Sequence, residues 1–215
     1  MIKGVIFDLD GLLIDSEPFW KKADIKLAKK YNFSIDDKFR KKLTGRGVKE
    51  CSEILMQSFN LKETVEDLTN ERLKYVYQFL FKDLKLMPFA RELIKKLKKH
   101  KFILALATAG HEKTTAIKLM QKLSIFKNFS FVMSGLELAN SKPAPDIYLL
   151  TAEKLKLSAT ECIVIEDSVN GAIAGKSADM KVVGINRDKE VRQSLKKAKA
   201  DYIFTNLNIP LKIFG

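Results

Sequence analysis

The segment GVIFDLDG at residues 4–11 decides how the chain folds and where its chemistry lies. Its apolar start, rich in β-branched and aromatic residues, predicts a short buried strand. Asp8 and Asp10 follow the strand, and because side chains alternate along an extended chain, both carboxylates point roughly the same way before Gly11 turns the chain. A lone Asp-x-Asp is typical of a turn or helix cap, so the pair gains chemical meaning only from other polar residues at the same edge.

Two further apolar runs, at residues 102–107 and 162–165, predict buried parallel strands, and each also ends in polar residues. Thr108 follows the first run, and Glu166 and Asp167 follow the second. The alternating order of strands and amphipathic helices predicts an α/β fold with a parallel sheet. Weaker strands are expected at 129–133, 182–185 and 202–204, and helices at 88–100, 112–124, 145–156, 169–178 and 188–198.

Residues 16–86 differ from the rest, because their apolar residues recur at helical spacing without a strand-like run. Ser34 and Thr64 are candidate helix starts, and Asp15 is expected to cap the first helix. The position of this segment, between the first two strong strands, predicts an all-helical insertion. The expected domains are a catalytic core of residues 1–15 and 87–215 and a cap domain of residues 16–86.

The 215-residue chain carries 39 Lys and Arg against 26 Asp and Glu, a formal net charge of +13. Its length fits one large domain or a domain with a substantial insertion. Its densest basic runs, 95–99 and 196–199, alternate with apolar positions at helical spacing. They therefore predict solvated helix faces, and we do not expect a nucleic-acid partner.

Cys51 and Cys162 form no disulfide or metal-ligand pattern, which predicts buried thiols in a reducing compartment. The chain shows no signal peptide and no apolar run long enough for a membrane span, so we expect a cytoplasmic protein with no membrane partner. We also expect a monomer or a weak dimer.

Ligands bind beyond the carboxyl ends of parallel strands, where the polar residues above would meet. Carboxylates crowded at this edge repel one another unless a cation is present, and hard oxygen ligands suit Mg²⁺. Thr108 and Ala109 precede a predicted helix, whose free N–H groups favour an anion. Lys142, on a loop stiffened by two prolines, can neutralise both a phosphate and a carboxylate.

Four motifs carry a resemblance to a known family: FDLDGLLIDSEP at 7–18, ATA at 107–109, KPAP at 142–145 and EDSVNG at 166–171. In this order and spacing they resemble the haloacid dehalogenase superfamily, and in particular its β-phosphoglucomutase-like sugar-phosphate phosphatases. The resemblance covers essentially the whole chain. It implies a Rossmann-like, doubly wound parallel-sheet core with an inserted helical cap.

The resemblance also implies roles for the strand-end residues. Asp8 would be the nucleophile that forms an aspartyl-phosphate, and Asp10 the general acid and then the base that activates water. Thr108, Ala109 and Lys142 would hold phosphoryl oxygens.

Mg²⁺ is the implied cofactor. Its ligands would be Asp8, the main-chain carbonyl of Asp10, and Asp167, with Glu166 either among them or directly behind them. The implied function is a Mg²⁺-dependent phosphatase acting on a small phosphorylated metabolite, such as a sugar or polyol phosphate.

Two departures from the family pattern bear on this function. Gly110 stands where the family usually has a small hydroxyl residue, so one phosphate hydrogen bond is missing. The mutases of the family have a histidine early in the first cap helix, whereas residues 19–22 read FWKK, which favours a phosphatase over the alternative of a β-phosphoglucomutase-type mutase. A phosphoryl-accepting receiver-like module is a further alternative, against which Asp10 and the insertion both argue.

Four residues are weaker candidates for contact with the substrate. The stretch Gly45-Arg46-Gly47 interrupts the helical insertion, so Arg46 or Lys49 is a candidate, with a plain interhelical turn as the alternative. Trp20 is expected in the cap interior or between cap and core. His111 is a candidate for lining the pocket, but we expect it to be an exposed residue near the start of a helix.

Overall fold

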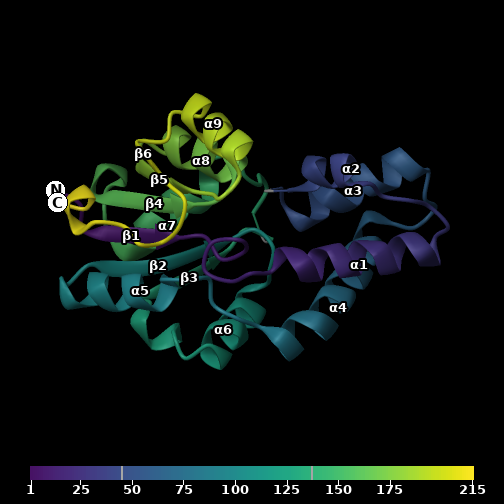
Figure 1. Cartoon of the computed structure of the whole chain (residues 1–215), viewed down its shortest axis with the longest axis horizontal. Coiled ribbons are helices and arrows are strands. Elements are labelled where there is room, and N and C mark those ends of the chain that lie inside the picture. The colour runs from purple at the N-terminus through teal and green to yellow at the C-terminus, as the bar shows by residue number, and fades with distance from the viewer. Residues whose placement is uncertain (45, 137) are drawn as a thin grey trace.

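A computed structural model describes residues 1–44, 46–136 and 138–215 of the chain (Figure 1). Six parallel strands form one sheet in the order β3-β2-β1-β4-β5-β6. The chain adds strands outward on one side of β1 and then on the other, which confirms the doubly wound α/β prediction. The strands are β1 (Gly4–Phe7), β2 (Ile103–Thr108), β3 (Phe131–Ser134), β4 (Cys162–Glu166), β5 (Lys181–Ile185) and β6 (Tyr202–Phe204).

The strand register brings the predicted polar residues to one edge of the sheet. Phe7 lies level with Leu106 on one side and with Ile165 on the other. Asp8, Thr108 and Glu166 therefore leave the three central strands close together at their carboxyl ends. All four residues of β1 are buried, because helices cover both faces of a parallel sheet.

Helices pack on both faces of the sheet (Figure 1). Side chains of α5 (Ala90–Lys99) and α6 (Lys113–Lys122) share a core with Val5 and Phe7. On the other face, α7 (Asp146–Leu155), α8 (Val169–Ser177) and α9 (Lys189–Lys197) pack around Ile6. Three short 3₁₀ helices are also present among the described residues: η1 (Phe126–Asn128) and η3 (Leu211–Ile213) on the α5 and α6 side, and η2 (Ala159–Glu161) on the other.

Four helices form an insertion that projects beyond the sheet, at the end opposite to both chain termini (Figure 1). We refer to them as the helical insertion: α1 (Glu17–Lys30), α2 (Asp37–Leu43), α3 (Val48–Phe59) and α4 (Val65–Asp83). The insertion has a small core of its own around Leu27, Leu55 and Leu68. This segment is helical as expected, because its apolar residues form helix faces that bury against each other.

The predicted helix starts of the insertion are right at one position and wrong at two. Thr64 caps α4, since its hydroxyl accepts a hydrogen bond from the amide of Asp67 at 3.1 Å. Ser34 does not begin a helix; Asp36 caps α2 instead. Asp15 does not cap α1 either, because the helix begins after Ser16, whose side chain makes no cap bond.

The two chain segments that join the insertion to the sheet pair with each other. Ile14 forms an antiparallel bridge with Leu86, and the amide of Met87 donates to the carbonyl of Leu13 at 2.9 Å. The insertion is thereby attached through two adjacent segments, the first of which follows Asp8 and Asp10 directly in the chain.

Both cysteines are free and buried, as predicted. Among the described residues, no helix combines the length and the apolar character that crossing a bilayer requires.

Candidate active site

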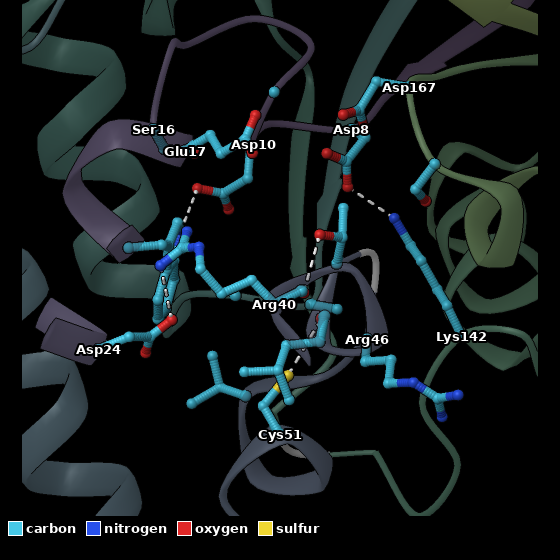
Figure 2. A pocket seen from close by; sticks show the side chains of 18 of the residues that line it. Asp8, Asp10, Ser16, Glu17, Asp24, Arg40, Arg46, Cys51, Lys142 and Asp167 are labelled. Carbon is cyan, nitrogen blue, oxygen red and sulfur yellow. Dashed lines mark hydrogen bonds and ion pairs between the residues drawn. The ribbon is translucent and has the colours of Figure 1, made fainter. Parts of the chain in front are cut away.

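A cavity of about 140 Å³ lies between the carboxyl edge of the sheet and the helical insertion (Figure 2). The sheet region contributes Asp8, Asp10 and Asp167 together with Lys142, as predicted from the strand ends. The insertion contributes the opposite wall. The cavity lining therefore combines residues far apart in the sequence, from both parts of the chain.

Lys142 holds two carboxylates together at the floor of this cavity. Its Nζ lies 2.6 Å from Asp8 Oδ1 and 2.6 Å from Glu166 Oε1, and it also reaches the carbonyl of Ala107 at 3.4 Å. Burial alone would lower the pKa of this lysine, but the charges of Asp8 and Glu166 outweigh burial and raise it well above its usual value. Lys142 therefore remains a cation beside the predicted nucleophile.

The oxygens of Glu166 are occupied by protein donors. Oε1 accepts from Lys142 and from the hydroxyl of Tyr148, each at 2.6 Å. Oε2 accepts from the amides of Asp167 and Ser168 at 3.1 Å and from the Ser168 hydroxyl at 2.9 Å. Glu166 thus fixes the position of Lys142 and of the loop that carries Asp167.

Carboxylate oxygens of Asp8, Glu166 and Asp167 lie within 4.8 Å of one another. Burial, aided by neighbouring carboxylates, raises the pKa of Asp8 to about 8 despite Lys142, and raises that of Asp167 well above its usual value. A buried group of like charges with hard oxygen donors meets the chemical requirements of a divalent cation such as Mg²⁺. The donor set therefore fits the expected metal.

Asp10 is held by donors from both parts of the chain. Its Oδ1 lies 3.0 Å from His111 Nε2 and 3.3 Å from the indole nitrogen of Trp20 on α1. Its Oδ2 is 3.5 Å from the hydroxyl of Thr108. Burial would raise the pKa of Asp10, but His111 and hydrogen bonds from Ser16 and Trp20 outweigh burial and lower it.

His111 is fully buried, so the expectation of an exposed position is wrong. Helix α6 begins two residues later, at Lys113, and the carbonyl of His111 accepts from the Ser134 hydroxyl at 2.8 Å. These features keep the imidazole inside, where Nδ1 lies 3.3 Å from the hydroxyl of Tyr77 on α4. His111 thus connects Asp10 to the insertion.

The structure explains why position 110 has no side chain. A Cβ atom on Gly110 would lie 2.7 Å from Asp10 Oδ2 and 3.5 Å from the Trp20 ring. A serine in this position would displace the carboxylate that His111 and Trp20 hold. Gly11 has a similar constraint, because φ is +76° and a Cβ atom would overlap the Asp167 carboxylate.

The other predicted phosphate and substrate residues do not all line this cavity. Ala109, Trp20 and Arg46 line the cavity. Thr108 is buried beside it, where its hydroxyl accepts from the Gly110 amide at 3.2 Å. Lys49 lines a different cavity of about 560 Å³, whose described lining does not include Asp8.

Arg46 is bound to Glu50 and donates from Nε to the carbonyl of Lys42 at 2.7 Å. Gly45, at the start of the proposed cap loop, lies outside the described residues.

Sequence reasoning assigned no role to four charged residues of the insertion that line the cavity: Glu17, Asp24, Arg40 and Arg72. Asp24 on α1 and Arg72 on α4 are 48 positions apart, and neither belongs to a recognisable motif. The available signal is a charge within an otherwise apolar helix face, which becomes specific only when a partner is known.

The sheet is doubly wound, an aspartate pair and an acidic pair lie at the ends of two adjacent strands, and a lysine lies between them. Together these features indicate an enzyme. Residues 5–185 match the family model of haloacid dehalogenase-like hydrolases, and the chain belongs to this family. The expected family, fold class and enzyme class are confirmed.

The chain is 33% identical over 202 residues to a phosphorylated carbohydrates phosphatase from Thermotoga maritima, covering 93% of this chain and 89% of that one. It is 32% identical to (DL)-glycerol-3-phosphatase 2 from Arabidopsis thaliana, with coverage of 85% and 78%. A crystal structure described as β-phosphoglucomutase from Clostridium difficile superposes with a TM-score of 0.86 at 27% identity, covering 99% of this chain and 95% of that one.

Proposed function

We propose that this protein is a Mg²⁺-dependent phosphatase that hydrolyses a small phosphorylated sugar or polyol through an aspartyl-phosphate. In this proposal residues 1–15 and 87–215 are the catalytic core and residues 16–86 the cap. The observation that carries it is the cavity floor, where Lys142 lies 2.6 Å from Asp8 and Asp10 shares the same small space. Similarity to phosphatases of phosphorylated carbohydrates and of glycerol phosphate supports the substrate class.

Asp8 attacks phosphorus with a carboxylate oxygen, and the bond to the leaving alkoxide breaks. Repulsion between this carboxylate and a phosphate dianion opposes the step, and the Lys142 ammonium reduces it. The main chain of Ala109 lines the cavity and supplies an N–H donor for a phosphoryl oxygen. Thr108 acts from behind, because its hydroxyl is already occupied by the Gly110 amide and Asp10.

Asp10 donates a proton to the leaving oxygen and afterwards accepts one from the water that attacks the aspartyl-phosphate. The negative charge of the bound phosphate opposes the effect of His111 on Asp10 and favours the protonated form that the first step needs. The bonds from His111 and Trp20 fix Oδ1, which leaves Oδ2, held only by the long 3.5 Å contact with Thr108, for the proton transfer. Both transfers use the same oxygen, so one orientation of the side chain serves both half-reactions.

Asp8, Asp167 and the main-chain carbonyl of Asp10 would hold Mg²⁺, with Glu166 behind them as the partner of Lys142. When bound, the cation offsets the negative charge of the carboxylates and of the phosphate. This assignment follows from the donors that already surround Glu166.

Removal of divalent metal should lower phosphate release by roughly two orders of magnitude or more, because crowded carboxylates then face the phosphate without compensation. The measurement is turnover of phenyl phosphate after chelation, followed by titration with MgCl₂, which should restore activity. Full activity in chelator would contradict the proposed metal dependence.

The experiment that tests the function is a phosphate-release screen with Mg²⁺ across sugar, polyol and nucleotide monophosphates, ranked by kcat/KM. We expect sugar or polyol phosphates to rank first. If none of these compounds releases phosphate, the proposed phosphatase activity is wrong.

A mutase is the second candidate, and the structural similarity to a β-phosphoglucomutase favours it. The sequence argument against a mutase is that residues 19–22 contain no histidine. The structure weakens this argument, because His111 gives Asp10 an imidazole partner from elsewhere in the chain. Conversion of a sugar 1-phosphate to its isomer, without release of inorganic phosphate, would establish a mutase. Membership in a hydrolase family favours either enzyme over a receiver-like module.

Replacing His111 with Leu should lower kcat/KM on alkyl phosphates by about tenfold or more, because this ratio reports the step in which Asp10 protonates the leaving oxygen. The loss should be much smaller for p-nitrophenyl phosphate, whose leaving group needs little protonation. His111→Gln, which retains a donor for Asp10, is the matched variant and should lose less. Equal losses on both kinds of substrate would contradict a role in positioning Asp10.

A further inference from the structure

Three charged side chains of the helical insertion converge on the wall of the active-site cavity opposite Lys142 (Figure 2). Arg72 on α4 donates from Nε to Asp24 Oδ1 at 2.7 Å and from a terminal nitrogen to Oδ2 at 3.4 Å. Arg40 on α2 reaches Asp24 Oδ2 at 3.4 Å. Asp24 and Arg72 are only 2% and 4% exposed. We call these residues the Asp24 cluster.

A purely structural role does not account for the cluster. Helices α1 and α4 already bury apolar residues against each other, and a buried ion pair adds little stability because both charges lose their hydration. An apolar pair at these positions would join the helices equally well. The cluster instead lines the cavity, and Arg40 adds a second cation from a third helix.

The arrangement of charge limits what the cluster can bind. The cavity lining carries five carboxylates, those of Asp8, Asp10, Glu17, Asp24 and Asp167, against four cations, those of Lys142, Arg40, Arg46 and Arg72. An additional anionic group would have to approach carboxylates of the same charge. A hydroxyl group both donates and accepts, so it matches a wall in which carboxylate acceptors and guanidinium donors stand side by side.

The size of the cavity limits the rest of the substrate. A volume of about 140 Å³ is below the ~300–1,000 Å³ of sites for drug-sized ligands. A nucleoside would exceed it, whereas a short carbon chain or a single sugar ring is of the appropriate size.

We infer that the Asp24 cluster is the subsite for the hydroxyl groups of the substrate, and that it selects neutral polyhydroxylated phosphate monoesters over phosphorylated acids and bisphosphates. This inference rests on the proposed phosphatase function, because it places the phosphate at Asp8 and the carbon chain against Asp24. Asp24 accepts from substrate hydroxyls, and Arg40 donates to them.

The test compares kcat/KM for sorbitol phosphate, phosphoglycolate and a sugar bisphosphate, each relative to phenyl phosphate, which has no hydroxyl groups. The wild-type protein should prefer sorbitol phosphate. Asp24→Asn should lower the ratio of sorbitol phosphate to phenyl phosphate by about tenfold or more, through a higher KM, because a charged hydrogen-bond acceptor is lost. Arg40→Gln, at a less buried position, should lower the same ratio and serves if Asp24→Asn does not fold.

The matched control is Lys30→Met. Lys30 on α1 also pairs with α4, through Glu71 at 2.6 Å, but neither residue lines the cavity. This variant should leave the substrate ratio unchanged.

If Asp24→Asn and Arg40→Gln lower turnover of every substrate by the same factor, or if the wild-type protein prefers phosphoglycolate or the bisphosphate, the inferred subsite is wrong while the phosphatase stands. If the wild-type protein releases phosphate from none of these compounds, including phenyl phosphate, the proposed function itself fails.

Discussion

Asp8→Asn should abolish phosphate release, with a loss of kcat of at least ~10⁴-fold, the scale seen when a nucleophile is removed from an active site. An amide at this position cannot form the acyl-phosphate, although it fills the same space as the carboxylate. The measurement is turnover of phenyl phosphate and of the best substrate from the screen, with saturating Mg²⁺. Activity within tenfold of the wild-type value would exclude Asp8 as the nucleophile.

The same variant should fold at least as well as the wild-type protein. Burial and neighbouring carboxylates raise the pKa of Asp8 to about 8, so its ionised form is unfavourable without a metal, and the neutral amide removes that repulsion. Lys142 keeps its bond to Glu166 at 2.6 Å. The melting temperature of metal-free Asp8→Asn should therefore equal or exceed that of the metal-free wild type, so lost activity is distinguished from unfolding.

Lys142→Met should lose both activity and stability. The lysine lies between Asp8 and Glu166, and its removal leaves two buried carboxylates without their cation. Breaking a buried ion pair from one side costs about 3–5 kcal/mol of the free energy of unfolding, which denaturant titration would measure. Activity should fall by several orders of magnitude, since the repulsion between Asp8 and phosphate is no longer offset.

The double variant Lys142→Met with Glu166→Gln separates the two losses. A glutamine in place of Glu166 removes one unpaired charge, and its oxygen can still accept from the amides of Asp167 and Ser168 while its amino group donates to the Tyr148 hydroxyl. The double variant should regain part of the stability without regaining activity. Recovery of turnover together with stability would indicate that Lys142 has only a structural role.

The sheet and its catalytic edge were predictable because buried parallel strands are continuous apolar runs, and their polar ends meet by geometry alone. Asp8, Lys142 and Asp167 each follow or flank such a signal, and the structure places all three in one cavity. The helix starts of the insertion were harder. Ser34 and Asp36 are equally good caps by residue type, and only the packing of the following helix decides between them.

The features that the sequence did not predict, namely the burial of His111 and the pairing of Asp24 with Arg72, depend on contacts between distant segments. His111 is buried because α4 and α1 place Tyr77 and Trp20 around it. Asp24 and Arg72 become partners only when α1 lies along α4. Spacing within one element gives no indication of such pairs. The sequence therefore predicted the residues at the cavity floor but not those of the opposite wall.

The paired connections of the insertion, Ile14 with Leu86 and Leu13 with Met87, have an evolutionary consequence. Since the chain leaves and re-enters the sheet region at neighbouring points, a different insertion of any length can be accommodated without moving the strands. Asp8 is anchored by Lys142 within the sheet region, whereas Asp10 also depends on Trp20 of the insertion. Exchange of the insertion would therefore leave Asp8, the proposed nucleophile, in place and alter the surroundings of Asp10, the proposed acid and base.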